Sequence, residues 1–170
     1  MRGIMGWLSA CAVGCLVMLA TSVLADEKAE KVQPDKLPQK IKDAVKARLP
    51  GAEVTSAEKE KENGEIVYDL ELKHEGRKYE MDIKEDGTII EIEKEIPAKD
   101  LPRRVARALM TKYPKATTKE VMEVYKVKGK EEKLDHYEVL LVTAEKMEME
   151  VTVSLDGKTI KGEKGEGEKK

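Results

Sequence analysis

The sequence repeats one helical segment after an interval of 64 residues. Residues 36–53 read KLPQKIKDAVKARLPGAE, and residues 100–117 read DLPRRVARALMTKYPKAT. Both stretches begin with Leu-Pro, carry an apolar residue every three or four positions and end with Pro-x-Ala. The charged residues differ freely between the copies, so the shared positions are those that build a helix with one buried face. A chain that carries this helix twice is expected to contain two related units.

After each helix, the hydrophobic pattern changes to a period of 2, which is typical of half-buried strands. Strands are expected in the first copy at residues 54–61, 66–72, 79–83 and 88–96. The second copy predicts strands at residues 121–128, 135–142, 147–154 and 158–161. Asp86-Gly87 in the first copy recurs as Asp156-Gly157, a pair that suits tight hairpin turns because glycine tolerates positive φ.

These patterns predict an α+β fold of two tandem units, each one helix followed by a four-stranded antiparallel sheet. A unit of about 60 residues buries too little surface to be stable alone, so we expect the two units to share one compact body. The predicted divisions are a signal peptide (1–25), a polar linker (26–36), the first repeat (37–96), the second repeat (97–161) and a disordered charged tail (162–170).

The first 25 residues have the layout of a secretory signal peptide. Arg2 precedes an apolar run, and small residues stand before the charged Asp26, so cleavage is expected after Ala25. Residues 8–11 imitate a lipoprotein cleavage box, but too little apolar sequence precedes Cys11 to make lipidation the favoured interpretation. The sequence thus predicts a periplasmic or secreted protein that has no membrane segment after signal cleavage.

The composition of the remaining chain limits its chemistry. Both cysteines, Cys11 and Cys15, lie inside the predicted signal peptide, so the mature chain must fold without disulfides. The full sequence has 32 basic and 34 acidic residues, and the two signs are intermixed along the chain. Nucleic acid is therefore not an expected partner.

Several short motifs resemble the PepSY-like, putative β-lactamase-inhibitor-like (BLIP-like) family of exported bacterial proteins. They are Leu37-Pro38, Leu-Pro-Gly-Ala at 49–52, Tyr68-Asp69-Leu70 and Asp86-Gly87, with Leu101-Pro102, Tyr113-Pro-Lys-Ala116, Tyr137-Glu138-Val139 and Asp156-Gly157 in the second copy. The resemblance covers residues 37–161 and implies a tandem helix-and-sheet fold. It also implies a non-catalytic module that binds or inhibits a protein, such as a secreted hydrolase or peptidase. A cystatin-like fold is the structural alternative, but the duplicated Leu-Pro and Asp-Gly landmarks favour the first interpretation.

No constellation of catalytic or cofactor-binding residues stands out in the sequence. No serine lies in a nucleophile elbow, and His74 and His136 lack the spacing of a catalytic or metal site. The Asp-Gly turns are too short for calcium loops. We therefore predict neither enzymatic activity nor a cofactor or metal site.

The alternative hypothesis is a periplasmic protein that binds a small ligand or a metal ion. Met147 and Met149 carry thioethers that bind Cu(I), and His136 and nearby carboxylates would complete such a site. Core packing is the favoured role for these methionines, because they alternate in phase with Val151 and Val153.

Acidic side chains alternate away from the apolar face of the predicted strands. Like charges opposite one another across strands are unfavourable, so either nearby lysines neutralise this face or a basic partner covers it. Lys73, Lys78 and Lys84 are the expected internal counter-ions. Leu140 and Val142 interrupt the charges, either as the centre of an interface or as the seam between the two units.

We therefore predict that the outer sheet face binds a protein partner in the cell envelope or outside the cell. The predicted binding residues are Asp69, Glu71, Glu80, Asp82, Glu138, Leu140, Val142, Glu148 and Glu150.

Overall fold

The computed structural model describes residues 29–62 and 64–164 of the chain. The two helices of the repeated segment are α1 (Gln39–Arg48) and α2 (Arg103–Lys112), and each follows a short 3-10 helix, η1 (Pro34–Lys36) or η2 (Ala98–Asp100). The strands are β1 (Glu30–Lys31), β2 (Glu53–Glu62), β3 (Glu65–His74), β4 (Arg77–Lys84), β5 (Ile89–Glu95), β6 (Thr117–Lys128), β7 (Glu131–Val142), β8 (Glu148–Ser154) and β9 (Ile160–Lys164). Within these residues, no helix is both long and apolar enough to cross a membrane.

A proline lies before the start and after the end of each helix, as the sequence predicts. Pro38 and Pro102 precede the first residue of α1 and α2, where a missing N–H costs nothing. Each helix ends two residues before the next proline, Pro50 or Pro114.

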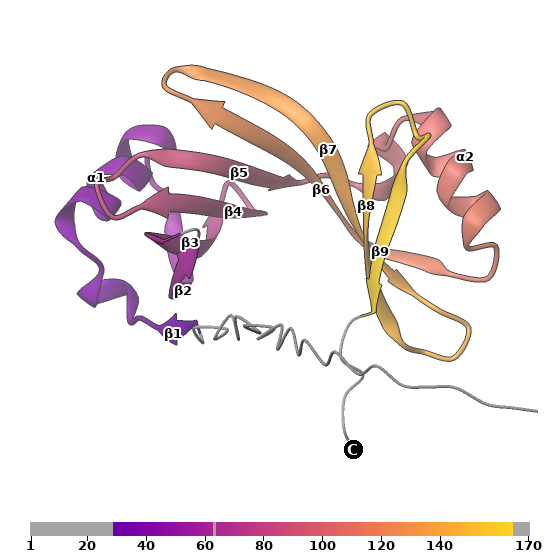
Figure 1. Cartoon of the computed structure of the whole chain (residues 1–170), viewed down its shortest axis with the longest axis horizontal. Coiled ribbons are helices and arrows are strands. Elements are labelled where there is room, and N and C mark those ends of the chain that lie inside the picture. The colour runs from indigo at the N-terminus through magenta and orange to yellow at the C-terminus, as the bar shows by residue number, and fades with distance from the viewer. Residues whose placement is uncertain (1–28, 63, 165–170) are drawn as a thin grey trace, which may run out of the picture.

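The nine strands form one antiparallel sheet in sequential order from β1 to β9. The α+β class is confirmed. The strands do not form two four-stranded units as expected but one nine-stranded sheet, because β5 pairs with β6 from Glu91↔Lys126 to Glu95↔Met122. The pairing has a physical reason: two separate sheets would each leave the hydrogen-bonding groups of an edge strand without partners. In Figure 1, β4 and β5 run across the view whereas β8 and β9 stand upright, so the continuous sheet twists strongly.

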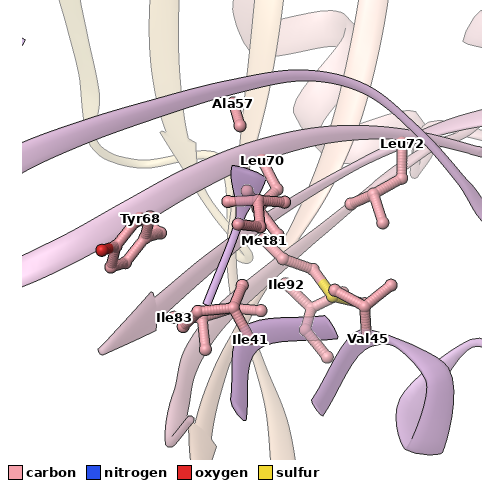
Figure 2. Packing of buried hydrophobic residues seen from close by; sticks show 10 residues of the cluster. Ile41, Val45, Ala57, Tyr68, Leu70, Leu72, Met81, Ile83 and Ile92 are labelled. Carbon is pink, nitrogen blue, oxygen red and sulfur yellow. The ribbon is translucent and has the colours of Figure 1, made fainter. Parts of the chain in front are cut away.

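Both helices pack on the same face of this sheet and lie at opposite ends of it (Figure 1). Ile41 and Val45 of α1 pack with Tyr68, Leu70 and Met81 in the first core cluster (Figure 2). Val105 and Leu109 of α2 pack with Val121, Val139 and Val151 in the second cluster. Both clusters lie on one face of the sheet. Ile92 of the first cluster pairs with Tyr125, and Tyr125 is on the same side of β6 as Val121 of the second cluster.

The Asp-Gly turns lie directly against the two helices. A Cβ on Gly87 would stand 3.1 Å from the carbonyl oxygen of Lys40 in α1, and a Cβ on Gly157 would stand 3.0 Å from that of Arg104 in α2. The φ angles of both glycines are positive, +90° and +74°. Glycine is therefore required both by the turn and by the close approach of the helix backbone.

The hairpin formed by β6 and β7 reaches from the second half of the molecule over the first (Figure 1). Val127 packs against the first core cluster, and Glu132 forms an ion pair with Arg48 of α1. The hairpin therefore ties the two halves together in addition to the β5–β6 pairing.

The predicted terminal segments differ partly from the structure. The linker predicted at 26–36 contains β1 and η1, and β1 extends the sheet by pairing with β2. Strand β9 continues to Lys164, three residues into the predicted disordered tail. The predicted signal peptide and the rest of that tail lie outside the described residues.

Candidate functional site

The face of the sheet opposite the helices carries most of the predicted binding residues, and we call it the open face. In β3 and β4, Tyr68, Leu70, Met81 and Ile83 point to the helix side, so the residues that alternate with them point to the open face. The same alternation, followed through the pairing register, places these carboxylates on the open face: Glu58, Asp69, Glu71, Glu80, Asp82, Glu91, Glu93, Glu138, Glu148 and Glu150.

Many of these carboxylates stand directly opposite one another across neighbouring strands. Asp82 of β4 pairs with Asp69 of β3 on one side and with Glu91 of β5 on the other. Glu80 pairs in the same way with Glu71 and Glu93. Each opposed pair of like charges costs up to about 1 kcal/mol, so the arrangement is unfavourable while all groups are ionised.

Burial and mutual repulsion raise the pKa values of three of these groups. Burial, followed by repulsion from Glu80, raises the pKa of Asp69 to about 6. Burial and the charges of Glu91 and Asp69 raise the pKa of Asp82 to about 7. The largest shift is that of Glu93, whose pKa is raised to about 9 by burial and then by repulsion from Glu138 and Glu80. The open face is thus partly protonated near neutral pH.

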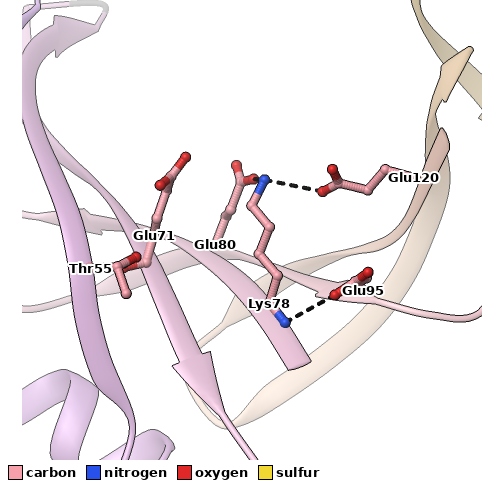
Figure 3. Close-up of polar contacts among 6 residues, drawn as sticks. All are labelled: Thr55, Glu71, Lys78, Glu80, Glu95 and Glu120. Carbon is pink, nitrogen blue, oxygen red and sulfur yellow. Dashed lines mark hydrogen bonds and ion pairs between the residues drawn. The ribbon is translucent and has the colours of Figure 1, made fainter. Parts of the chain in front are cut away.

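Lysines compensate only part of this charge. The ammonium of Lys78 lies 2.7 Å from Glu80 Oε1 and 3.1 Å from Glu120 Oε1, which links β4 to β6 (Figure 3). Burial lowers the pKa of Lys78, but the hydrogen bonds to Glu80 and Glu120 outweigh it and raise the pKa above its ordinary value. Lys126 forms an ion pair with Glu91, whereas Lys84 pairs with Glu65 rather than with an opposed carboxylate. The third predicted counter-ion, Lys73, stands opposite Lys78.

A cavity of about 130 Å³ opens on this face where β4, β5, β6, β7 and β8 come together, and we call it the open-face cavity. Its lining includes the side chains of Lys78, Glu80, Glu93, Glu120, Met122, Glu138, Leu140 and Glu150. The cavity is therefore lined mainly by carboxylates, and Met122 and Leu140 add apolar surface.

The structure brings four predicted residues together at this cavity: Glu80, Glu138, Leu140 and Glu150. Val142 and Glu148 pair with each other farther along β7 and β8, where Glu148 also forms an ion pair with Lys119. The two halves join where β5 pairs with β6, whereas Leu140 and Val142 lie on β7 and pair with β6 and β8 of the second half.

Glu93, Glu120 and Met122 also line the cavity, although the sequence patterns did not single them out as candidate site residues. Glu93 alternates with the buried Ile92, a signal that would have placed it on the open face. Glu93 lies near Met122 and Glu138, however, only because β5 pairs with β6, and local periodicity does not predict which strands pair.

The residues of the alternative metal hypothesis do not form one site. His136 contacts Asp135 at 2.9 Å and Glu138 at 3.1 Å, and these contacts raise the pKa of His136 and lower that of Glu138. Met149 packs against the second core cluster, as expected, while Met147 is 47% exposed. Across residues 29–62 and 64–164, no group of three or more histidine, cysteine or acidic residues has an arrangement that would hold a metal ion.

Comparison with known sequences gives one family match. The profile of the family described as "putative beta-lactamase-inhibitor-like, PepSY-like" matches residues 23–91 and residues 67–161. The search of curated proteins found no match.

Several solved structures from species of Bacteroides have a similar fold. A DUF2874 family protein from Bacteroides uniformis has a TM-score of 0.58 at 14% identity, covering 75% of this chain and 88% of that one. A BLIP-like protein from Bacteroides fragilis has a TM-score of 0.52 at 19% identity, covering 78% and 91%. A structure from Bacteroides eggerthii, described as one of "putative periplasmic proteins", has a TM-score of 0.58 at 12% identity, covering 75% and 88%. At these identities the likeness concerns the fold alone.

Proposed function

The chain belongs to the putative β-lactamase-inhibitor-like, PepSY-like family, and from this premise we propose that it is a non-enzymatic binding module whose open face binds a protein partner in the cell envelope. The duplicated helix and strand pattern supports a further part of this proposal, that the sheet arose from two tandem copies of one unit. The partner carries basic residues where it meets the open face, and a secreted hydrolase or peptidase is the class that the family name suggests.

The opposed carboxylates of the open face carry this proposal. Asp69, Asp82 and Glu91 stand in one cross-strand row, and Glu71, Glu80 and Glu93 stand in the next. A sheet that served only to support the helices would gain stability from alternating charges at these positions. Contact with a basic surface relieves the repulsion and also steers the approach of the partner.

The proposed location rests on two observations. Residues 1–25 have the pattern of a signal peptide, with cleavage expected after Ala25. A solved structure with a similar fold is described as that of a periplasmic protein. A periplasmic or secreted location is therefore proposed for this chain.

Chemical crosslinking in an envelope extract of the source organism tests the proposed surface. The bait is the purified protein, compared with a variant in which Glu71, Glu80, Glu148 and Glu150 are replaced by lysine. We expect the variant to lose at least about tenfold of the captured partner, because four attractive charges become repulsive ones.

A matched control replaces Asp35, Asp43, Glu85 and Glu145 by lysine, since these acidic residues lie in helices or turns away from the open face. It undergoes the same change in net charge and should retain capture. Circular dichroism checks that both variants are folded. Equal capture by both variants, or equal loss in both, would contradict binding at the open face.

A further inference from the structure

The open-face cavity is large enough to hold one side chain. Its volume is about 130 Å³, and a cavity of about 150 Å³ in another protein holds a single benzene molecule. A folded segment is far too large to enter, whereas one extended side chain projecting from a partner surface fits.

Resting on the proposed function, we propose that the open-face cavity receives a single lysine or arginine side chain of the partner. The alkyl stem lies against Met122 and Leu140, and the cationic head lies beside Glu93. This residue would be the central contact of the interface, surrounded by the more exposed carboxylates of the open face.

The lining of the cavity matches both parts of such a side chain. Met122 is only 5% exposed, and with Leu140 it supplies apolar surface for the stem. Glu80, Glu93, Glu138 and Glu150 supply carboxylates for the head. The protein already places one ammonium group at this cavity, because Lys78 bridges Glu80 and Glu120 (Figure 3). The carboxylates that line the cavity therefore already bind one ammonium group.

Glu93 is the carboxylate with unmet binding capacity. Among the described residues, it makes no hydrogen bond or ion pair, whereas Glu80 pairs with Lys78 and Glu138 contacts His136. The titratable and charged groups facing it are Lys78, Glu80 and Asp82 from β4, Glu91 and Glu95 from β5, Glu120 and Lys126 from β6, His136 and Glu138 from β7, and Glu150 from β8. Acidic groups outnumber basic ones in this set, which favours an added cation.

Binding of a cation beside Glu93 is coupled to loss of its proton. Burial and the neighbouring carboxylates raise the pKa of Glu93 to about 9, so this carboxyl group is protonated at pH 7. An entering ammonium or guanidinium favours the ionised carboxylate and lowers this pKa. Where the bound cation lowers the pKa below the pH of the solution, one proton is released for each side chain bound.

Isothermal titration calorimetry tests this coupling with a defined probe, acetylated hexalysine amide. Titrations at pH 7 in phosphate and in Tris, which differ in ionisation enthalpy, give the number of protons released. We expect about one proton for the natural protein, and an affinity that rises by up to about tenfold per pH unit between pH 7 and pH 8.5. The slope is assigned to Glu93 between pH 8 and pH 8.5, because Asp82, with a pKa of about 7, is still partly protonated at pH 7 and adds to the slope there.

Glu93→Gln should abolish the proton release and weaken binding by about tenfold or more at pH 8. Glu71→Gln, a change of the same kind on the same face but outside the cavity, should retain the release and weaken binding by less than about threefold. If hexalysine binds without proton release, or if the two variants weaken it equally, the cavity inference fails while binding at the open face stands. If hexalysine does not bind at all, both proposals fail.

Discussion

At the residue scale, the carboxyl groups of Asp69, Asp82 and Glu93 make the stability of the protein depend on pH. Their pKa values in the folded protein, about 6, 7 and 9, lie above the ordinary values near 4 of an unfolded chain. Between these limits the folded state binds more protons than the unfolded state. These groups therefore make the protein less stable as the pH rises from about 4 towards 9.

Asp82→Asn should remove part of this dependence. Asp82 opposes both Asp69 and Glu91, so its neutral replacement should raise the free energy of unfolding by about 1 kcal/mol at pH 8. The gain should shrink as the pH falls and should vanish only below about pH 4, where Asp82 is protonated in both the folded and the unfolded chain. Thermal unfolding followed by circular dichroism should show a Tm about 2–4 °C higher at pH 8.

Glu145→Gln is the control for this measurement, because Glu145 is an exposed carboxylate in the turn between β7 and β8. It should leave the Tm unchanged across this pH range. A Tm that falls at pH 8 in Asp82→Asn would show that the opposed carboxylates are not in conflict.

Alternation along the chain was sufficient to identify part of the open face. The period of 2 in β3 and β4 separates Asp69, Glu71, Glu80 and Asp82 from the core residues, and the pairing register confirms that they share a face. The protonation of Glu93 was not predictable, because it results from burial and from carboxylates on strands far apart in the sequence.

At the scale of elements, the repeated Asp-Gly turns fix how each helix rests on the sheet. The sequence predicts these turns, but it does not reveal that Gly157 touches the backbone of α2. Gly157→Ala should therefore cost about 2 kcal/mol or more, because it combines a strained positive φ with a Cβ placed 3.0 Å from a helix carbonyl. Urea unfolding measures the loss.

Gly129→Ala provides the matched control. Gly129 also has a positive φ, +63°, but a Cβ there would have no neighbour within 4 Å. This variant should lose only the cost of the backbone strain, about 1 kcal/mol. Equal losses in the two variants would contradict a role for the turn–helix contact.

Both helices and eight of the nine strands could be predicted from periodicity and turn residues. The exception is β1, which has only two residues, Glu30 and Lys31, and no apolar side chain to produce a pattern. Such a strand is stabilised by its pairing with β2, a contact that local sequence does not encode.

At the scale of the whole molecule, one continuous sheet joins two core clusters. The β5–β6 pairing and the contact of Val127 with the first cluster both cross between the halves. Two repeats predict a compact body, but whether their sheets remain separate depends on pairing between units and cannot be inferred from either repeat alone.

Thermal unfolding should therefore proceed in a single cooperative transition. Ile41→Ala in the first cluster and Val105→Ala in the second should lower the same Tm, since both side chains are fully buried. The expected costs are about 2–5 kcal/mol for Ile41→Ala and somewhat less for the smaller Val105. Calorimetry that resolves two transitions, each shifted by only one variant, would show that the halves unfold independently.

The central claim is that the helix-free, acidic face of the sheet is the binding surface. Carbodiimide labelling of carboxylates, followed by mass spectrometry, tests it directly when the free protein is compared with its crosslinked partner complex. We predict that Glu71, Glu148 and Glu150 become protected in the complex, while Asp35, Asp43 and Glu145 label equally in both states. Protection of the second group with continued labelling of the first would contradict the claim.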